Sequence, residues 1–380
     1  MNPQSLKTDV LVAGGGPAGL AAAIALRQKG FEVAIADPAH PPIDKACGEG
    51  VMPEGVRALK ALGVAIDPRA SFPLKGIRFL SGAVSTEAAF PCGRGAGIRR
   101  TALHQALLGR AAEAGVRILW GAQVRPPMET GGEGEPVSID GRPAQYGWLI
   151  GADGQNSPVR RWAGLDQARR VSTRFGFRRH FQAEPWSDSV EVYWGGQASV
   201  GQLFVTPVGP AEVCVALLSR NPQPRLQDQL PFFPDVARRL KNAKPTSAER
   251  GGVTVSRSLH AVCRGRVALV GDASGSVDAI TGDGLCLAFQ QAVALAAAIA
   301  QNNLALYQAA HRRITRMPAL MARLMLALDR HPGLQRRALR GLAMEPWMFS
   351  RLLAVHLGAA PPAAFGVRGV VTLGWRLLTA

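Results

Sequence analysis

The sequence has 380 residues, 47% hydrophobic and 19% charged, which is typical of a folded chain with more than one core and excludes disorder. Its net charge of +17 is consistent with a basic surface, an anionic membrane or an acidic partner. We expect no nucleic-acid partner, because the sequence has no zinc-ligand spacing, helix-turn-helix pattern or basic run with interleaved aromatic residues.

The first 37 residues predict a strand–helix–strand unit. Residues 9–13 form a short, β-branched apolar run, which is typical of a buried parallel strand. A glycine-rich turn follows, and residues 20–29 then predict an Ala- and Leu-rich helix that ends at Gly30. Residues 31–36 predict a second strand, with Asp37 at its end.

The elements that follow predict a Rossmann-like unit interrupted by a second sheet. A helix is predicted at residues 98–114, and buried strands at 116–120, 148–152 and 266–270. Between them, short alternating segments predict antiparallel strands at residues 189–193, 199–205 and 212–218. Residues 285–300 predict a long helix. The last 70 or so residues predict further helices, with breaks at Pro318, Pro332, Pro346 and Pro361-Pro362.

The spacing Gly14-x-Gly16-x-x-Gly19 predicts a dinucleotide site. The glycines permit a tight turn close to a pyrophosphate, and the helix N-terminus that follows supplies free N–H groups. Asp37 comes 18 residues after Gly19 at a strand end, where an acid binds ribose hydroxyls. The alternative, a glycine-rich turn without a ligand, is disfavoured because strand, helix, second strand and acid are all in place.

Two later segments favour FAD over NAD. Residues 265–292 predict a strand, then Gly271-Asp272, then Gly282-x-Gly284 at the start of a helix. An acid at a strand end can bind ribitol or ribose hydroxyls, and a helix start can stabilise negative charge on a reduced flavin. The alternative role of Asp272 is a helix cap. Residues 151–161 contain a similar acid–glycine turn at Asp153.

These three motifs, in this order, resemble the superfamily of p-hydroxybenzoate hydroxylase, the class A flavin monooxygenases, which also contains geranylgeranyl reductases and flavin-dependent halogenases. The segment Arg100-x-x-Leu103-x-x-x-Leu107 is similar to the helix whose arginine lies near the cofactor, and the resemblance spans residues 9 to about 300. It implies NAD(P)H as the reductant and no metal. It also implies that FAD is bound by Gly14, Gly16, Ala18, Gly19, Asp37, Arg100, Val124, Asp153, Gly271, Asp272, Gly282, Asp283 and Gly284.

The resulting prediction is an α/β fold: a Rossmann-like FAD-binding domain of the GR2 type, an inserted antiparallel substrate sheet and a helical C-terminal part. We place the FAD-binding domain at residues 1–75, 95–165 and 255–300. The substrate domain is predicted at residues 76–94 and 166–254, and the C-terminal helical region at 301–380.

The sequence leaves the reaction open. The Cys47-Gly-Glu49-Gly stretch is similar to the loop that geranylgeranyl reductases place beside the flavin, and residues 280–284 also resemble reductases. However, the reductase signature Tyr-x-Trp-x-Phe-Pro is missing, since residues 202–207 keep only Pro207. The halogenase signature Trp-x-Trp-x-Ile-Pro is absent too. The sequence slightly favours hydroxylation of an aromatic, polyketide-like or isoprenoid substrate over reduction of a carbon–carbon double bond. A flavin-binding regulatory protein is the non-enzymatic alternative.

Cys47 and Glu49 are the candidate catalytic residues. Cys47 could lie against the flavin and the substrate, or could be a small buried hydrophobe. Glu49 could donate a proton, or could be a surface or capping acid. For His104, on the Arg100 helix, we expect a surface or packing role.

The five cysteines form no CxxC pair, which argues against a disulfide framework and indicates a reduced, cytoplasmic location. We expect no signal peptide and no transmembrane helix. Apolar stripes with neighbouring arginines, such as Leu324 beside Arg323, mark the C-terminal helices. These stripes are either core-facing or form an interfacial face that contacts a membrane peripherally and receives a hydrophobic small-molecule substrate.

Overall fold

A six-stranded sheet carries the N-terminal strand–helix–strand unit in the computed structural model, which describes residues 6–125, 137–195 and 200–379. All its strands are parallel except the edge strand β19. In spatial order the strands are β19 (Cys263–Arg264), β20 (Val267–Leu269), β12 (Gln145–Gly151), β1 (Lys7–Ala13), β2 (Val33–Asp37) and β8 (Arg117–Trp120). The predicted Rossmann-like pieces therefore come from distant stretches of the chain.

Both faces of this sheet are buried, which explains the uninterrupted apolar runs of its strands. In β1, Val10 and Val12 belong to one hydrophobic core, whereas Leu11 and Ala13 belong to the core on the other face. Three helices supply much of the first core: α1 (Pro17–Arg27), α3 (Arg100–Glu113) and α7 (Gly284–Ala300). This packing fixes the carboxyl ends of the strands, which the glycine and acid motifs follow.

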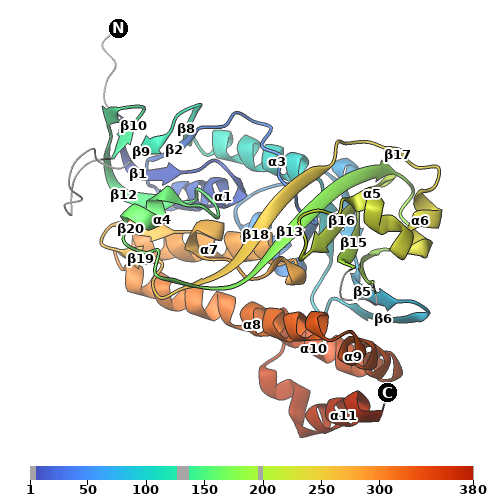
Figure 1. Ribbon diagram of the computed structural model, residues 1–380. Helices are drawn as coiled ribbons and strands as arrows, with labels where there is room; N and C mark the ends of the chain where they lie inside the picture. Colours follow the sequence, from blue (N-terminus) through green and yellow to red (C-terminus); the bar gives the residue numbers. More distant parts are fainter. Residues whose placement is uncertain (1–5, 126–136, 196–199, 380) are drawn as a thin grey trace.

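A second, eight-stranded sheet lies beside the first (Figure 1). Its two long strands, β13 and β18, pair with each other and extend toward the six-stranded sheet (Figure 1). The strands are β17 (Lys244–Pro245), β13 (Ala168–Gln182), β18 (Arg250–Leu259), β16 (Glu212–Ser219), β15 (Gln202–Gly209), β14 (Ser189–Trp194), β5 (Gly76–Ser81) and β6 (Val84–Ala89).

Side chains of β13 alternate between the two faces of this sheet. Phe177 and Phe181 belong to an apolar core that α5 (Leu226–Gln229) and α6 (Pro234–Leu240) help to form. Arg178 and His180 project from the opposite face and are buried against the loop at residues 44–50. We call this face of the sheet, marked by Arg178 and His180 of β13 and Cys214 of β16, the inner face.

Shorter elements connect the two sheets. Two three-stranded sheets consist of β3 (Gly50–Val51), β7 (Gly95–Ile98) and β4 (Ser71–Leu74), and of β11 (Arg142–Pro143), β10 (Ser138–Ile139) and β9 (Val124–Arg125). The remaining short helices are α2 (Pro53–Ala61), α4 (Pro158–Trp162), η1 (Pro68–Ala70), η2 (Leu230–Phe232), η3 (Gly271–Ser274), η4 (Ala279–Thr281) and η5 (Pro362–Phe365).

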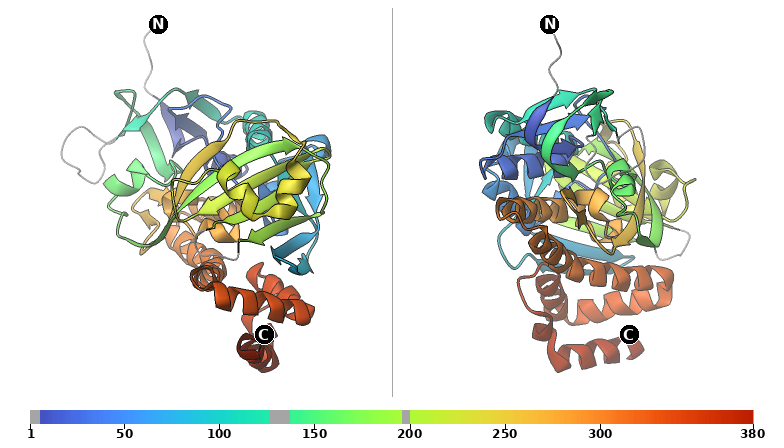
Figure 2. Two further views of the ribbon diagram at one scale, coloured as in Figure 1. Left: turned by 45° about the vertical axis from the view of Figure 1, so that its right-hand side comes forward. Right: turned by 90° about the vertical axis from the view of Figure 1, so that its left-hand side faces the viewer.

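The C-terminal helices gather at one end of the molecule (Figures 1 and 2). They are α8 (Leu304–Arg330), α9 (Pro332–Met344), α10 (Pro346–His356) and α11 (Gly366–Thr379). Pro332 and Pro346 begin new helices, as predicted. The predicted break at Pro318 is wrong, because Pro318 lies buried inside α8. Packing of residues such as Leu326 keeps this helix continuous against an intrinsic cost of about 3 kcal/mol for an internal proline.

The predicted domain boundaries stay predictions. Strands β5 and β6 do belong to the eight-stranded sheet, whereas β18 crosses the boundary placed at residue 255. Residues 126–136 of the predicted FAD-binding domain and residue 199 of a predicted strand lie outside the described residues. Within the described part of the chain, no helix is both long and apolar enough to cross a membrane.

Candidate flavin site

The first glycine motif forms the turn between β1 and α1, and its three glycines meet different steric demands. Gly14 has a φ of 111°, and a Cβ there would lie 2.4 Å from the carbonyl oxygen of Ala152. A Cβ on Gly19 would lie 1.9 Å from the Gly14 carbonyl oxygen, so this glycine lets α1 pack against the turn. A Cβ on Gly16 would meet no described atom within 4 Å. The turn therefore fits a pyrophosphate lying over Gly16 at the start of α1.

Asp37 and His104 hold this turn in place. Asp37 accepts hydrogen bonds from the backbone N–H of Gly15 at 2.6 Å and of Ala39 at 2.8 Å, and its oxygens keep lone pairs for a ribose hydroxyl. His104 Nε2 lies 2.8 Å from the Gly15 carbonyl oxygen. Burial lowers the pKa of His104, so a neutral ring donates this hydrogen bond. His104 therefore holds the Gly15 carbonyl in position, a role beyond the surface or packing role that we expected.

The Gly271-Asp272 motif lies directly beside the first motif. A Cβ on Gly271 would lie 2.7 Å from the Cβ of Ala18, so the end of β20 and the start of α1 touch. The Asp272 side chain is exposed and caps no helix among the described elements. Even so, desolvation raises the pKa of Asp272, while the charges of Lys45 and Arg100 oppose this. The carboxylate is thus surrounded by protein but not covered by it, as binding of a ribitol or ribose hydroxyl requires.

Arg100 stands between these motifs and the Cys47 loop. It is the first residue of α3, and its charge acts on the pKa values of Asp272, Cys47 and His104. Its Nε is buried and has no hydrogen-bond partner among the described residues. Such a donor costs about 1–3 kcal/mol unless a partner satisfies it. Phosphate or ribityl oxygens of FAD would supply this partner, so the residues present fit the cofactor.

Gly282 and Gly284 flank Asp283 at the start of α7. Gly282 has a left-handed φ of 72°, and a Cβ there would lie 3.9 Å from Cε of Met52. A Cβ on Gly284 would meet none of the described atoms within 4 Å. Free N–H groups in the first turn of a helix favour negative charge, which suits the carbonyl end of a flavin. The Asp283 side chain is buried and contacts His356 instead.

Asp153 and Val124 have different surroundings. Asp153 accepts a hydrogen bond from the N–H of Val159 at 3.0 Å and so anchors the first turn of α4, and burial raises its pKa. The next residue, Gly154, approaches Lys45, because a Cβ on Gly154 would lie 3.8 Å from Lys45 Nζ. Val124 is buried in the core on the other face of the six-stranded sheet. The same core contains Ala13 and Ala36, the residues just before Gly14 and Asp37.

The Cys47 loop presents two different side chains. Cys47 is half-buried, and desolvation raises its pKa, so the side chain is a protonated thiol. Its Sγ accepts a hydrogen bond from the N–H of Glu49 at 3.4 Å. Glu49 itself is only 1% exposed. Cys47 can face a ligand, whereas the Glu49 carboxylate cannot reach one without rearrangement, which disfavours Glu49 as the direct proton donor.

Glu49 joins three parts of the fold. Its Oε2 accepts a hydrogen bond from Nε2 of His180 at 2.6 Å, and its Oε1 accepts one from the N–H of Arg100 at 3.0 Å. Nε of Arg178 lies 3.6 Å from the same Oε1. Glu49 also has a left-handed φ of 59°, which costs a residue with a side chain about 1–3 kcal/mol. These buried contacts hold the loop in its strained conformation.

The group Glu49, His180 and Cys214 contains potential metal ligands, with its three donor atoms within 4.8 Å of one another. However, the Glu49 and His180 atoms are 2.6 Å apart, a hydrogen-bond distance. Two ligands on one zinc ion, each about 2.0–2.1 Å from it, stand farther apart in tetrahedral geometry. The geometry therefore fits a hydrogen-bonded pair.

Sequence reasoning missed the contribution of the inner face. Arg178 and His180 contact the Cys47 loop from β13, and Arg178 also pairs with Asp44. The sequence did contain a signal for this face, because these two basic residues alternate with Phe177 and Phe181 along one strand. Which acids they meet depends on the approach of a loop more than 100 residues away in sequence.

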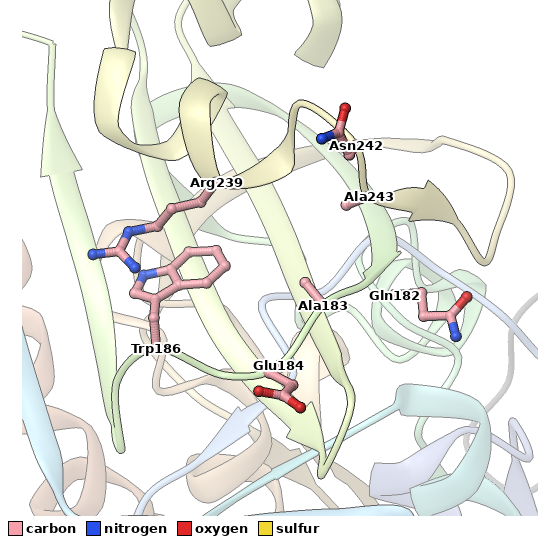
Figure 3. Close-up of a pocket in the computed structure, with 7 residues that line it drawn as sticks. All are labelled: Gln182, Ala183, Glu184, Trp186, Arg239, Asn242 and Ala243. Atoms are coloured by element: carbon pink, nitrogen blue, oxygen red, sulfur yellow. The ribbon is translucent and has the colours of Figure 1, made fainter.

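A surface hollow of about 360 Å³ lies elsewhere, beside the end of β13 (Figure 3). The Arg239 guanidinium lies over the Trp186 ring there, 5.1 Å from its centroid. None of the predicted cofactor residues lines this hollow. Its lining residues are Gln182, Ala183, Glu184, Trp186, Arg239, Asn242 and Ala243.

Comparison with known proteins identifies a family for the chain. The family model described as an FAD binding domain matches residues 7–306. The menaquinone reductase of Mycolicibacterium smegmatis is 27% identical over 300 residues, covering 73% of each chain. The digeranylgeranylglycerophospholipid reductase of Methanoculleus marisnigri is 31% identical over 295 residues, covering 73% of this chain and 72% of the relative.

Solved structures share the fold at lower identity. A flavoprotein/dehydrogenase from Cytophaga hutchinsonii has a TM-score of 0.80 at 17% identity and 98% coverage of both chains. A geranylgeranyl bacteriochlorophyll reductase-like protein from Thermoplasma acidophilum has a TM-score of 0.70 at 21% identity, covering 97% of this chain and 96% of that one. For 2-methyl-3-hydroxypyridine-5-carboxylic acid oxygenase the TM-score is 0.69 at 22% identity, with coverages of 93% and 96%. The chain belongs to the FAD binding domain family and is an FAD-dependent oxidoreductase of the superfamily that contains p-hydroxybenzoate hydroxylase and the geranylgeranyl reductases.

Proposed function

We propose that the protein reduces a carbon–carbon double bond of a hydrophobic, isoprenoid-type substrate, with NAD(P)H as the electron source and FAD as the carrier. The observation that carries this proposal is the position of the Cys47–Gly50 loop. It is fixed by Glu49 against the inner face and is followed by Met52, whose N–H donates a hydrogen bond to Sγ of Cys286 in α7 at 3.3 Å. This is the loop that resembles the flavin-side loop of geranylgeranyl reductases.

The sequence alone slightly favoured hydroxylation, whereas the comparisons support reduction. The relatives that match about three quarters of the chain carry reductase names. The likeness to an oxygenase lies below 25% identity and concerns the fold. In addition, Ser274, Ser276 and Asp278 stand where hydroxylases usually carry His and Pro after the Gly-Asp pair.

An apolar layer next to the Gly282–Gly284 motif supports a hydrophobic substrate. Ile280, two residues before Gly282, packs with Leu218 of the eight-stranded sheet and with Ala322 and Leu326 of α8. Phe204 and Met325 border the same cluster. A substrate carbon placed beside this layer would lie in apolar surroundings that exclude water.

The chain's own residues then have distinct tasks. Bound FAD supplies the hydride. Gly16 would leave room for its pyrophosphate, Asp37 and Asp272 would bind its hydroxyls, and the start of α7 would favour negative charge at its carbonyl end. Reduction of a double bond also needs a proton. The Cys47 thiol holds one at Sγ, because burial raises its pKa, whereas Glu49 positions the loop.

We further propose that the C-terminal helices contact an anionic membrane from which such a substrate is taken. Residues 301–380 contain eleven arginines, no lysine and two acids. Both acids already pair inside the protein, Asp329 with Arg174 and Glu345 with Arg376. On α8, the large apolar side chains of Leu320 and Leu324 are exposed. Exposed arginines beside apolar side chains suit the surface of an anionic bilayer.

Liposome flotation tests the membrane contact. The protein should float with vesicles that contain anionic phospholipid and stay behind with neutral vesicles. Leu320→Ser combined with Leu324→Ser should reduce binding to the anionic vesicles, whereas Phe232→Ser, an exposed apolar side chain of η2, should not. Equal binding by all three proteins would contradict this docking face.

Oxygen dependence tests the reaction. Under anaerobic conditions with NAD(P)H, a reductase should convert a polyprenylated substrate to product, with one NAD(P)H oxidised per double bond reduced. A hydroxylase would consume oxygen in proportion to product and would stop without it. Anaerobic turnover thus supports reduction, and product formed only with oxygen would overturn the proposal in favour of hydroxylation.

A further inference from the structure

The last residue of α10 reaches the flavin-side start of α7. His356 Nε2 lies 3.1 Å from Oδ1 of Asp283, and both side chains are more than nine-tenths buried. Phe349 and Leu353, on the same helix, pack into the main hydrophobic core and fix the helix against it. The C-terminal helical region therefore contacts the motif Gly282–Gly284 through one buried ion pair.

Asp283 is unusual because its carboxylate is only half satisfied. Its Oδ2 is buried and has no hydrogen-bond partner among the described residues, and the same holds for Nδ1 of His356. Glu54 of α2 places a second acid close enough to act on both groups. Arg57, an exposed residue, acts on Glu54 from the same helix. A buried acid without a counter-charge would be costly here, so the contact with His356 matters for the charge of the site.

We propose that His356 is a positioning residue that sets the redox balance of bound FAD, by cancelling the negative charge of Asp283 at the start of α7. The proposal rests on the proposed placement of the flavin at Gly282–Gly284. It assigns a role in the flavin site to a C-terminal helix that lies outside the part of the chain matched by the FAD-binding family model.

Two opposite charges act at the start of α7. The N-terminus of a helix carries about half a positive elementary charge, which favours the anionic, reduced flavin over the neutral, oxidised one. A full negative charge on Asp283, one residue before the helix begins, would more than cancel this effect. An imidazolium at His356 restores the balance, because the Asp283–His356 pair is then neutral.

The surroundings favour the charged form of His356. Burial alone would lower its pKa, but the carboxylate of Asp283 and, more weakly, that of Glu54 outweigh burial and raise it. His356 also ends α10, where the partial negative charge of the helix C-terminus adds to the attraction. The imidazolium is thus present below the raised pKa and is lost as the pH rises through it.

The test is the midpoint potential of FAD in the holoenzyme, measured anaerobically against a reference dye without substrate. His356→Gln should lower the potential by about 30 mV, which corresponds to a tenfold loss of preference for reduced over oxidised FAD in a two-electron couple. Adding Asp283→Asn to this variant should restore the wild-type value. His331→Gln is the control, since His331 is exposed at the start of α9 and should leave the potential unchanged.

The wild-type protein gives a second test that does not depend on the stability of a variant. At high pH, where the imidazolium of His356 is lost, the difference in midpoint potential between the wild type and His356→Gln should disappear. Equal potentials of wild type and His356→Gln at neutral pH, or no recovery on adding Asp283→Asn, would overturn the inference. The measurement needs no substrate, so it is independent of whether the enzyme reduces double bonds. A protein that binds no FAD would instead refute the flavin site itself.

Discussion

The carboxylate of Glu49 and the imidazole of His180 meet at 2.6 Å, and this contact ties the Cys47 loop to the eight-stranded sheet. Nδ1 of His180 lies 3.2 Å from Nη1 of Arg178, which can only donate, so Nε2 carries the proton that Glu49 accepts. Glu49, which the sequence suggested as a proton donor, therefore holds the Cys47 loop against the inner face instead.

Glu49→Ala should therefore destabilise the fold. Removing the carboxylate leaves Arg178 with one buried partner fewer and leaves the His180 N–H unpaired, and breaking such a pair costs about 3–5 kcal/mol. Urea unfolding of the holoprotein measures this loss. Glu184→Ala, which removes an exposed acid, should change the free energy of unfolding by no more than about 0.5 kcal/mol. Equal stability of the two variants would show that the buried cluster contributes nothing.

Two glycines of the first motif should respond differently to the same change. Gly16→Val should give a folded protein without FAD, because its side chain enters the space assigned to the pyrophosphate and its Cβ meets no described protein atom within 4 Å. Gly19→Val should instead prevent folding, since its Cβ would lie 1.9 Å from the Gly14 carbonyl oxygen. Circular dichroism and the FAD content of the purified proteins measure both effects. Full FAD content in folded Gly16→Val would mean that the pyrophosphate lies elsewhere.

His104→Ala should weaken FAD binding about fivefold, because a hydrogen bond worth about 1 kcal/mol no longer fixes the Gly15 carbonyl. Titration of the apoprotein with FAD gives the dissociation constant. His260→Ala is the matched control, as His260 is exposed. If both variants bind FAD as tightly as the wild type, the glycine turn does not need His104.

Cys47→Ala should slow substrate turnover and leave FAD content unchanged, because the side chain faces the site from a loop whose fold depends on Glu49. Cys92→Ala, which alters an exposed cysteine, should have no effect. Single-turnover rates with FAD-loaded enzyme separate the two. A wild-type turnover rate for Cys47→Ala would show that the thiol takes no part in the reaction.

The stability of the fold should fall in mild acid through His311. Its Nε2 lies 3.0 Å from Oγ of Ser274, which in turn donates to the carbonyl of Gly271, and burial lowers the pKa of His311 to about 4. Because the unfolded chain takes up this proton near pH 6.5, the contribution is complete above about pH 6.5 and is lost as the pH falls toward 4. The loss amounts to at most about 3 kcal/mol.

Unfolding measured from pH 7 to pH 4 for wild type and His311→Leu tests this dependence. The advantage of the wild type over the variant should shrink as the pH falls. His331→Leu, altering an exposed histidine, should follow the wild-type curve. Parallel curves for wild type and His311→Leu would show that His311 is not kept neutral in the fold.

Local sequence was sufficient for the cofactor motifs. The turn at Gly14–Gly19 and the acid at Asp37 are adjacent to the strands and the helix that position them, so their spacing alone predicts their relation. The order of the three motifs likewise predicted the superfamily and the Rossmann-like sheet assembled from distant segments. Pro318 shows the limit of such local rules, because packing along α8 outweighs the intrinsic cost of an internal proline.

Only the tertiary structure decided which partners surround the flavin-side loops. Glu49 meets His180 across more than 100 residues, and Asp283 meets His356 across more than 70, through the packing of a sheet face and a C-terminal helix. Alternation along β13 shows which side chains share a face, but it does not show which loop will cover that face. Burial then fixes what each group can do: it keeps Glu49 away from a ligand, leaves Cys47 half-open and makes the charge of Asp283 depend on a helix that the cofactor motifs do not include.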